Sequence, residues 1–303
     1  MKTINYLPAL TFVILSFFSI GQEEKPLKRI VVSDVQLYSG MLFKMDVNGT
    51  LADFRSLAPQ SELLKNDFSS YPQDERYGSS GDMGISMMIG IQFRDKKNER
   101  YRANPLLRLG FNYSSGLTIA GSMSKGIISP FDTLTSAQTS NVYYIDSTHS
   151  ESYHMFYSSE QLRFDGSLMF RTNPEARWSV FSGIGITAGI SINANSRIHY
   201  TERKSQYIHG PGGSYIHSSE YRSLLPTNEE YEEHRNKTSF GFSAYVPLGL
   251  DFRLANGNKF WSRMHLFYEA KLAVDFTSIP ELYTVTNTTF QHGLGIRYCL
   301  GRN

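Results

Sequence analysis

Apolar and polar residues alternate in eight separate segments of the chain. In residues 82–95, for example, Met83, Ile85 and Ile89 share one face while Gly84 and Ser86 share the other. A period of two is typical of β-strands, because successive side chains point to opposite faces. We therefore predict strands over 34–46, 82–95, 104–123, 154–172, 177–197, 239–254, 261–277 and 287–300.

The polar faces of these segments are unusual for a water-soluble sheet. The wet face of a β-sandwich is expected to carry many Lys and Glu and few glycines. Here it is rich in Gly, Ser and Asn, with charges of both signs, whereas the apolar faces carry no charge. This combination favours a β-barrel with an apolar outside and a narrow, polar inside.

The connections support the same architecture. Residues 95–100, 173–176 and 255–259 are short turns, and they alternate with the connections 47–81, 124–153, 198–238 and 278–286, three of which are long. Outer-membrane barrels have short periplasmic turns and long external loops. We predict an all-β, transmembrane, antiparallel up-and-down barrel, most simply of eight strands, with ten strands as the alternative. We further expect 141–147 to pair with 152–158 as an external hairpin, and 61–66 to form one or two helical turns.

The first 21 residues predict a secretory signal peptide. Lys2 precedes an apolar stretch from Leu7 to Ile20, which is followed by Gly21 and a polar run. Beyond it no run of 18 apolar residues occurs, so helical membrane spans are not expected. We assign residues 1–21 to the signal peptide, 22–33 to a periplasmic tail and 34–303 to a single barrel domain.

The net charge bears on the binding partner, and the cysteine content bears on how the fold is stabilised. The formal net charge is only +2 and the basic residues do not form a stripe, so nucleic acid is not an expected partner. Cys299 is the only cysteine, which excludes an intrachain disulfide. Stability must therefore come from strand pairing.

Charged residues lie at predicted inward positions of the barrel. Burying isolated charges costs several kcal/mol each, so we expect them to pair in an interior that is only wide enough for side chains. The predicted lumen charge network consists of Arg163, Asp165, Asp251, Glu269, Lys271 and Arg297, with Glu269, Lys271, Arg163 and Asp165 near mid-height. The further inward charges are Arg94, Arg108, Arg171, Arg253 and Asp275. The alternative is that the charges line an ion path.

No residue set predicts catalysis, a cofactor or a metal site. His265 and Glu269 share the inner face of one strand, but no nucleophile can be assigned to them. His199, His209, His217 and His234 have no compact metal-binding spacing. In the same region, 210–213 predicts a Gly-Pro turn and 229–235 a solvated, charged face.

Aromatic residues gather near the ends of the predicted strands. This is typical of the two girdles that mark the membrane interfaces. The short-turn end carries Trp178, Trp261, Phe252, Phe170, Phe93 and Tyr298, and the long-loop end carries Phe240, Phe276 and Phe290.

In these features, and in its closing strand at 290–298, the chain resembles the small outer-membrane β-barrel proteins of the OmpA/OmpX-like group. It departs from their usual aromatic last residue, since residues 300–303 follow Tyr298. The resemblance implies a place in the cell outer membrane, with outer-membrane lipids, the barrel assembly machinery and an unknown extracellular ligand as partners. It implies a non-enzymatic structural or surface-interaction role through external loops. A small passive pore is the alternative, followed by a lipid-modifying or proteolytic barrel enzyme and a secreted β protein outside the membrane.

Overall fold

A computed structural model gives the structure of the protein. It describes residues 30–45, 47–72, 79–93, 105–172, 176–210, 228–255, 257 and 260–300. The predicted signal peptide, most of the predicted tail, Arg94 and His217 lie outside these residues.

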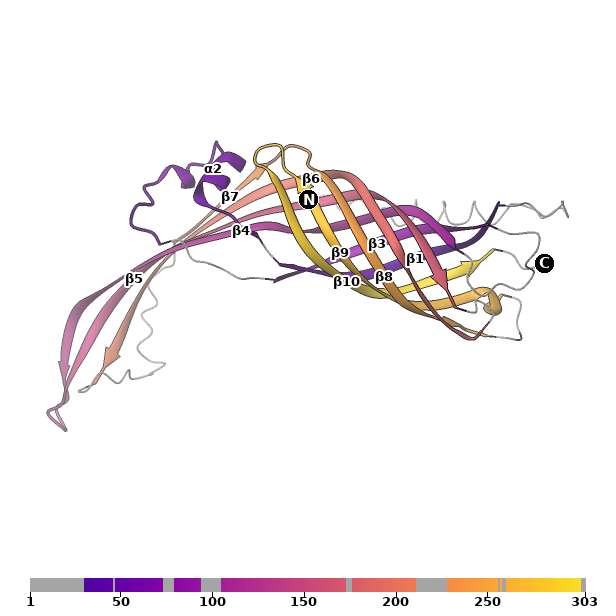
Figure 1. Ribbon diagram of the computed structural model, residues 1–303. Helices are drawn as coiled ribbons and strands as arrows, with labels where there is room; N and C mark the ends of the chain where they lie inside the picture. The colour runs from indigo at the N-terminus through magenta and orange to yellow at the C-terminus, as the bar shows by residue number, and fades with distance from the viewer. Residues whose placement is uncertain are drawn as a thin grey trace.

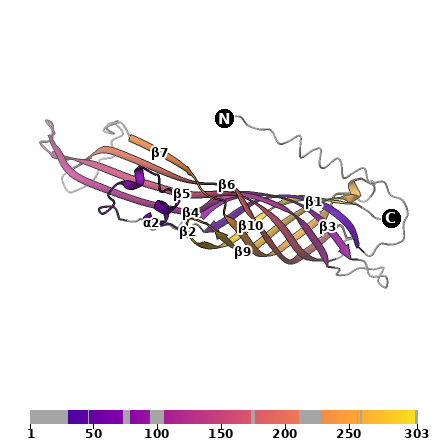
Figure 2. The same cartoon turned by 90° about the horizontal axis from the view of Figure 1, so that it is seen from above.

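Eight antiparallel strands form a closed ring (Figures 1 and 2). Each strand pairs with the next along the ring, and β1 pairs with β10 to close it. In ring order the strands are β1 (Ile30–Met45), β3 (Ser79–Phe93), β4 (Leu106–Thr135), β5 (Val142–Arg171), β6 (Trp178–His209), β8 (Phe240–Arg253), β9 (Met264–Ser278) and β10 (Thr284–Cys299). The predicted eight-stranded, up-and-down barrel is confirmed.

Two further strands pair outside the ring and do not enlarge it. β2 (Val47–Asn48) runs parallel to β4, and β7 (Asn228–Arg235) pairs with the upper part of β6. The ten-stranded alternative is therefore wrong. The start of β1 also differs from the predicted one, since Ile30 already pairs with Phe93, inside the segment predicted as a tail.

β4, β5 and β6 are about twice as long as the other barrel strands, at 30, 30 and 32 residues. They continue past the barrel rim as one sheet, which β7 extends at its base (Figure 1). We call residues 119–135, 142–157 and 196–209, together with β7, the blade. The predicted loop 124–153 is thus mostly strand, and the predicted hairpin between 141–147 and 152–158 is wrong. Both of those segments belong to β5, and they pair with β4 and β6 instead.

The outside of the barrel is apolar and exposed. Ile184, Leu272 and Leu294 leave 63%, 61% and 68% of their surface uncovered, and similar side chains surround the ring. A belt of this size would be strongly unfavourable in water but suits lipid chains. The predicted aromatic residues stand at its margins, with Trp178 beside Phe252 at the short-turn end and Phe240 exposed at the other. No described helix is long and apolar enough to cross a membrane.

Inside the barrel, large aromatic rings lie against glycines on the neighbouring strand. Phe267 is the direct cross-strand partner of Gly295, and a Cβ on Gly295 would come within 2.2 Å of that ring. Phe181 with Gly249 repeats the arrangement, at 2.2 Å. The glycine-rich inner face therefore provides room for a few bulky rings in a narrow interior.

A short helical segment packs against one face of the blade, where β4, β5 and β6 leave the barrel. It contains α2 (Leu51–Leu57), whose start is fixed by a capping box between Thr50 and Asp53, and the 3₁₀ helix η2 (Leu63–Lys65). η2 lies within the stretch predicted to be helical. We call residues 50–71 the cap.

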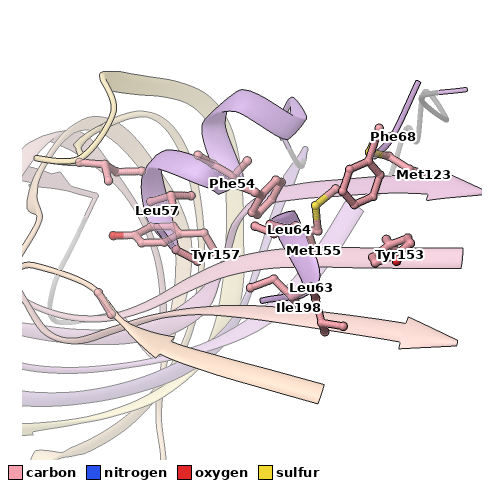
Figure 3. Packing of buried hydrophobic residues seen from close by; sticks show 14 of the residues in the cluster. Phe54, Leu57, Leu63, Leu64, Phe68, Met123, Tyr153, Met155, Tyr157 and Ile198 are labelled. Atoms are coloured by element: carbon pink, nitrogen blue, oxygen red, sulfur yellow. The ribbon is translucent and has the colours of Figure 1, made fainter. Parts of the chain in front are cut away.

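The cap is held by an apolar cluster (Figure 3). Phe54, Leu57 and Leu64 pack against Met155 and Ile198 from the inner face of the blade, and all five are almost fully buried. Hydrophobic burial, rather than a disulfide, therefore fixes the cap to the sheet.

Candidate functional site

The centre of the lumen holds a bidentate ion pair between Arg108 and Glu269. Arg108 Nη1 lies 2.6 Å from Glu269 Oε2, and Nη2 lies 3.3 Å from Oε1. Lys271 Nζ approaches Glu269 at 3.4 Å and Asp165 at 3.8 Å. The hydroxyl of Tyr245 donates a 2.6 Å hydrogen bond to Asp165. Two cations and two anions thus balance each other in a buried cluster.

A second cluster surrounds Asp251 toward the short-turn end. Arg297 donates two hydrogen bonds of 2.9 Å to its carboxylate, and His265 Nδ1 lies 2.5 Å from Oδ1. Arg171 lies 3.7 Å away, and Arg297 also reaches Asp34 at 3.8 Å. Again two carboxylates face two guanidinium groups, so this end of the lumen is also neutralised.

Gln36 connects the two clusters. Its Nε2 donates to Asp34 at 2.6 Å, while its Oε1 accepts from Arg108 at 3.5 Å. β1 carries both Gln36 and Asp34, so this strand bridges the two charged layers. Asp34 was not among the predicted inward charges because it lies at the very start of the alternating segment.

The third pair lies near the external rim. Arg163 pairs with Asp275 and also donates a 2.6 Å hydrogen bond to Gln161, and Thr289 donates to Asp275 at 3.0 Å. Arg163 was predicted beside Glu269, Lys271 and Asp165. That placement is wrong, because the strand register puts Arg108 at the centre instead.

The structure places all six residues of the predicted network inside the barrel, in three layers rather than one. Each is at most 9% exposed. The layers are Asp165, Glu269 and Lys271 at the centre, Asp251 and Arg297 below, and Arg163 above. Every one of them has an oppositely charged partner within 4 Å. The arrangement can fix the barrel strands to each other and can fill the interior with cancelling charge.

The histidines do not assemble a recognisable reaction centre. In the described chain, the hydrogen bonds of His265 are to Asp251 and Arg297, and no serine is among its partners. His199, His209 and His234 lie on separate parts of the blade, paired with Glu229, Asp146 and Glu232. No group of three or more His, Cys, Asp or Glu within the described ranges could hold a metal ion.

The outer part of the blade exposes apolar side chains beyond the barrel rim. Ile127, Ile128 and Phe131 on β4 are 51%, 66% and 62% exposed, and Val142 and Tyr144 on β5, which pair with Thr135 and Thr133 nearer the end of the blade, are exposed as well. The segment 229–235, predicted as a solvated loop, is β7 at the base of the blade. The sequence of β7 does not show an alternation of apolar and polar residues, because most of its residues are charged.

One carboxylate of β7 fastens the cap. Glu232 accepts hydrogen bonds from the hydroxyl of Ser61 and from the backbone N–H groups of Glu62 and Leu63, at 3.1 and 3.3 Å for the latter two. His234 lies 3.1 Å away. Burial raises the pKa of Glu232, but these hydrogen bonds outweigh it and hold the pKa below its usual value.

No family profile and no curated protein sequence matches the chain. Among solved structures, Neisserial surface protein A is similar at 11% identity and a TM-score of 0.28, over 89% of this chain and 99% of the other. Ail, the attachment invasion locus protein of Yersinia pestis, is similar at 12% identity and a TM-score of 0.23, over 88% of this chain and 100% of the other.

The assignment of the fold rests on this chain's own strand pairing. A closed ring of eight antiparallel strands, an exposed apolar belt with aromatic margins and a charged, filled interior are the features of small outer-membrane barrels. This chain is an eight-stranded β-barrel of the cell outer membrane.

Proposed function

We propose that the protein is a surface-binding barrel, in which the closed barrel anchors the chain and the blade makes contact with a partner outside the cell. The observation that carries the proposal is the group of exposed apolar side chains Ile127, Ile128 and Phe131 in the outer part of the blade, which we call the apolar tip. Ile127 and Ile128 are consecutive on β4 and therefore lie on opposite faces of the blade, so both faces expose apolar surface. Large apolar side chains gathered on a part of a protein that faces water mark interaction sites. The tip lies far from the lipid-facing belt, so lipid contact does not account for it (Figure 1).

The edge of the blade adds a second means of contact. β2 pairs with β4 only at Ile119 and Ala120, and beyond this point the described partner of β4 is β5 alone. Among the described strands, none pairs with the side of β4 opposite to β5 beyond Ala120, and an extended segment of another protein could join there as an additional strand. We infer a protein partner that offers an apolar, extended segment.

The test shortens the blade without touching the barrel. Gly126 and Ser150 are direct partners across β4 and β5. Joining them through an Asn-Gly turn removes the tip and leaves the remaining register intact. Cells that display the full chain should attach to alkyl-coated glass beads and to one another, and cells that display the shortened chain should not. Heat-modifiable gel mobility verifies that both barrels are folded.

A second variant separates apolar contact from blade length. The triple change Ile127→Thr, Ile128→Thr and Phe131→Thr keeps residues that favour strands but removes the apolar surface. It should reduce attachment as far as the shortening does, while Thr133→Ser on the same hairpin should have no effect. Unchanged attachment in both the shortened and the triple variant would contradict the proposed role of the blade.

A passive pore is less well supported. It would require inward charges that line a water path, whereas Arg108, Lys271 and Arg297 each face a carboxylate within 4 Å. We propose no catalytic role for His265, because its Nδ1 already contacts Asp251 and Arg297.

A further inference from the structure

A cavity of about 330 Å³ lies where the cap meets the inner face of the blade. The cap contributes Tyr71, β5 contributes Tyr153 and β6 contributes Tyr200. It belongs neither to the lumen nor to the apolar tip, so the proposed function makes no use of it. All of its lining residues are among those that the structure describes.

Three tyrosine rings form an aromatic wall. The rings of Tyr71 and Tyr153 are 5.6 Å apart and nearly perpendicular, and those of Tyr153 and Tyr200 are 4.8 Å apart. Asn66 donates a 3.0 Å hydrogen bond to the hydroxyl of Tyr153, and Tyr71 donates one to Glu151. The rings are therefore held in place before any ligand arrives, which lowers the cost of binding.

The rings remain uncharged at neutral pH. Burial first, and the carboxylates of Glu151 and Glu202 next, raise the pKa of Tyr200 to about 12. Burial is also the largest cause of the raised pKa of Tyr71 and Tyr153. Neutral rings present an electron-rich face, which attracts cations.

Two carboxylates complete the lining. Glu151 lies on β5 two residues nearer the tip than Tyr153, and Glu230 on β7 is the direct cross-strand partner of Tyr200. Glu230 is exposed, and the hydrogen bond that the structure describes for it is a weak one of 3.5 Å from Asn228. A cation in the cavity would thus meet aromatic faces and negative charge together.

The chain already places one cation against this wall. Lys125 Nζ lies 5.3 Å from the centre of the Tyr71 ring. Lys125 does not line the cavity, but its ammonium group lies over the Tyr71 ring, which forms part of the aromatic wall. The aromatic cluster therefore accepts an ammonium group in the geometry expected of a cation–π contact.

We propose that this cavity binds a small organic cation, namely an ammonium or guanidinium group carried on a short alkyl chain. The cation lies among Tyr71, Tyr153 and Tyr200, and Glu230 and Glu151 balance its charge. The cavity volume is at the lower end of that of small-molecule sites, which suits a ligand of the size of a Lys or Arg side chain.

The test titrates n-butylamine and n-butylguanidine into the refolded protein in a non-ionic detergent, with n-butanol as the uncharged analogue. Met123, the cross-strand partner of Tyr153, reports binding through its labelled methyl NMR signal, and lipid-facing Met83 serves as the remote reference. Both cations should shift the Met123 signal in a saturable way and leave Met83 unchanged. n-Butanol should not shift Met123.

Variants on β7 provide a matched pair. Glu230→Gln should weaken binding of both cations by tenfold or more, whereas Glu229→Gln should leave it unchanged, because Glu229 is paired with Thr201 and points to the opposite face. Lys125→Gln should tighten binding severalfold, since it removes a competing charge and uncovers one face of Tyr71.

The opposite results would overturn the proposal. These are equal binding of n-butanol, equal weakening by Glu229→Gln and Glu230→Gln, or a shift of Met123 by methyl glucoside but not by the cations, which would indicate a carbohydrate site instead. The shortened blade keeps Glu151 and the whole cavity lining, so failure of the cation site and failure of the tip can be distinguished.

Discussion

Arg108 Nη1 lies 2.6 Å from Glu269 Oε2 inside the barrel, although the two residues are 161 positions apart in the sequence. The pair joins β4 to β9, which are not neighbours in the ring. The pair therefore connects opposite sides of the barrel through its interior, whereas the backbone hydrogen bonds connect only neighbouring strands.

We expect loss of one member of this pair to be strongly destabilising. Arg108→Met leaves Glu269 buried with Lys271 as its remaining cation, and loss of one partner of a buried pair typically costs about 3–5 kcal/mol. The double variant Arg108→Met with Glu269→Leu should recover most of this loss. Urea unfolding from lipid vesicles, followed by Trp178 and Trp261 fluorescence, measures both. Arg197→Met, in a half-exposed pair with Glu233, is the control and should cost less than about 1 kcal/mol.

We expect no steady conductance from the protein in a planar lipid bilayer. The charges of the lumen cancel in pairs and their side chains are buried, which leaves no selectivity-lined path of the kind that a pore needs. The triple variant Arg108→Ala, Glu269→Ala and Lys271→Ala should open measurable events, which also verifies insertion. Reproducible openings of the unaltered chain would favour the pore over the closed anchor.

We expect Gly295→Val to destabilise the barrel by about 1–3 kcal/mol, because even a Cβ at this position would overlap the Phe267 ring. Phe267→Ala alone should also be destabilising, since it leaves a cavity. The two changes together should be less harmful than their sum. A double-mutant cycle in the urea assay measures this coupling, and simple additivity would show that the ring and the glycine do not constrain each other.

We expect the cap to loosen in acid. The folded-state pKa of Glu232 is depressed, so its contribution to docking is complete above the ordinary glutamate range of about 4.3 and is lost as the pH falls through the lower, folded value. The methyl NMR signal of Met155, which packs beside Phe54, reports cap docking. It should move in acid in the unaltered chain. Glu232→Gln, which cannot titrate there, should not show this transition.

The barrel could be predicted from the sequence because its signal is local. Alternation along one strand shows which residues face lipid. Ile184 and Leu294, for example, lie on the predicted apolar faces of their strands and are exposed on the outside of the barrel. The partners of each inward charge depend on the register between strands, which no single strand encodes. Arg108 and Arg163 therefore could not be told apart, and the central position was assigned to the wrong arginine.

The blade was missed for a different reason. Beyond the bulge between Leu117 and Ile119, β4 leaves the membrane while its strand continues. Its exposed positions then carry Ser129 and Asp132 as well as Ile128. The contrast between the two faces therefore weakens, and the sequence of the segment resembles that of a loop. Only the helical turn of the cap at 61–66 was predicted, and the helix Leu51–Leu57 was missed. The docking of the cap depends on Met155 and Ile198, which are distant in sequence.

The length of the blade also determines what the protein can reach. A strand advances about 3.3 Å per residue, so the roughly 15 residues of β5 between Val142 and Phe156 give the blade a length of about 50 Å along its curved strands (Figure 1). A blade of this length would let a protein embedded in one membrane touch an opposing surface that lies several nanometres away.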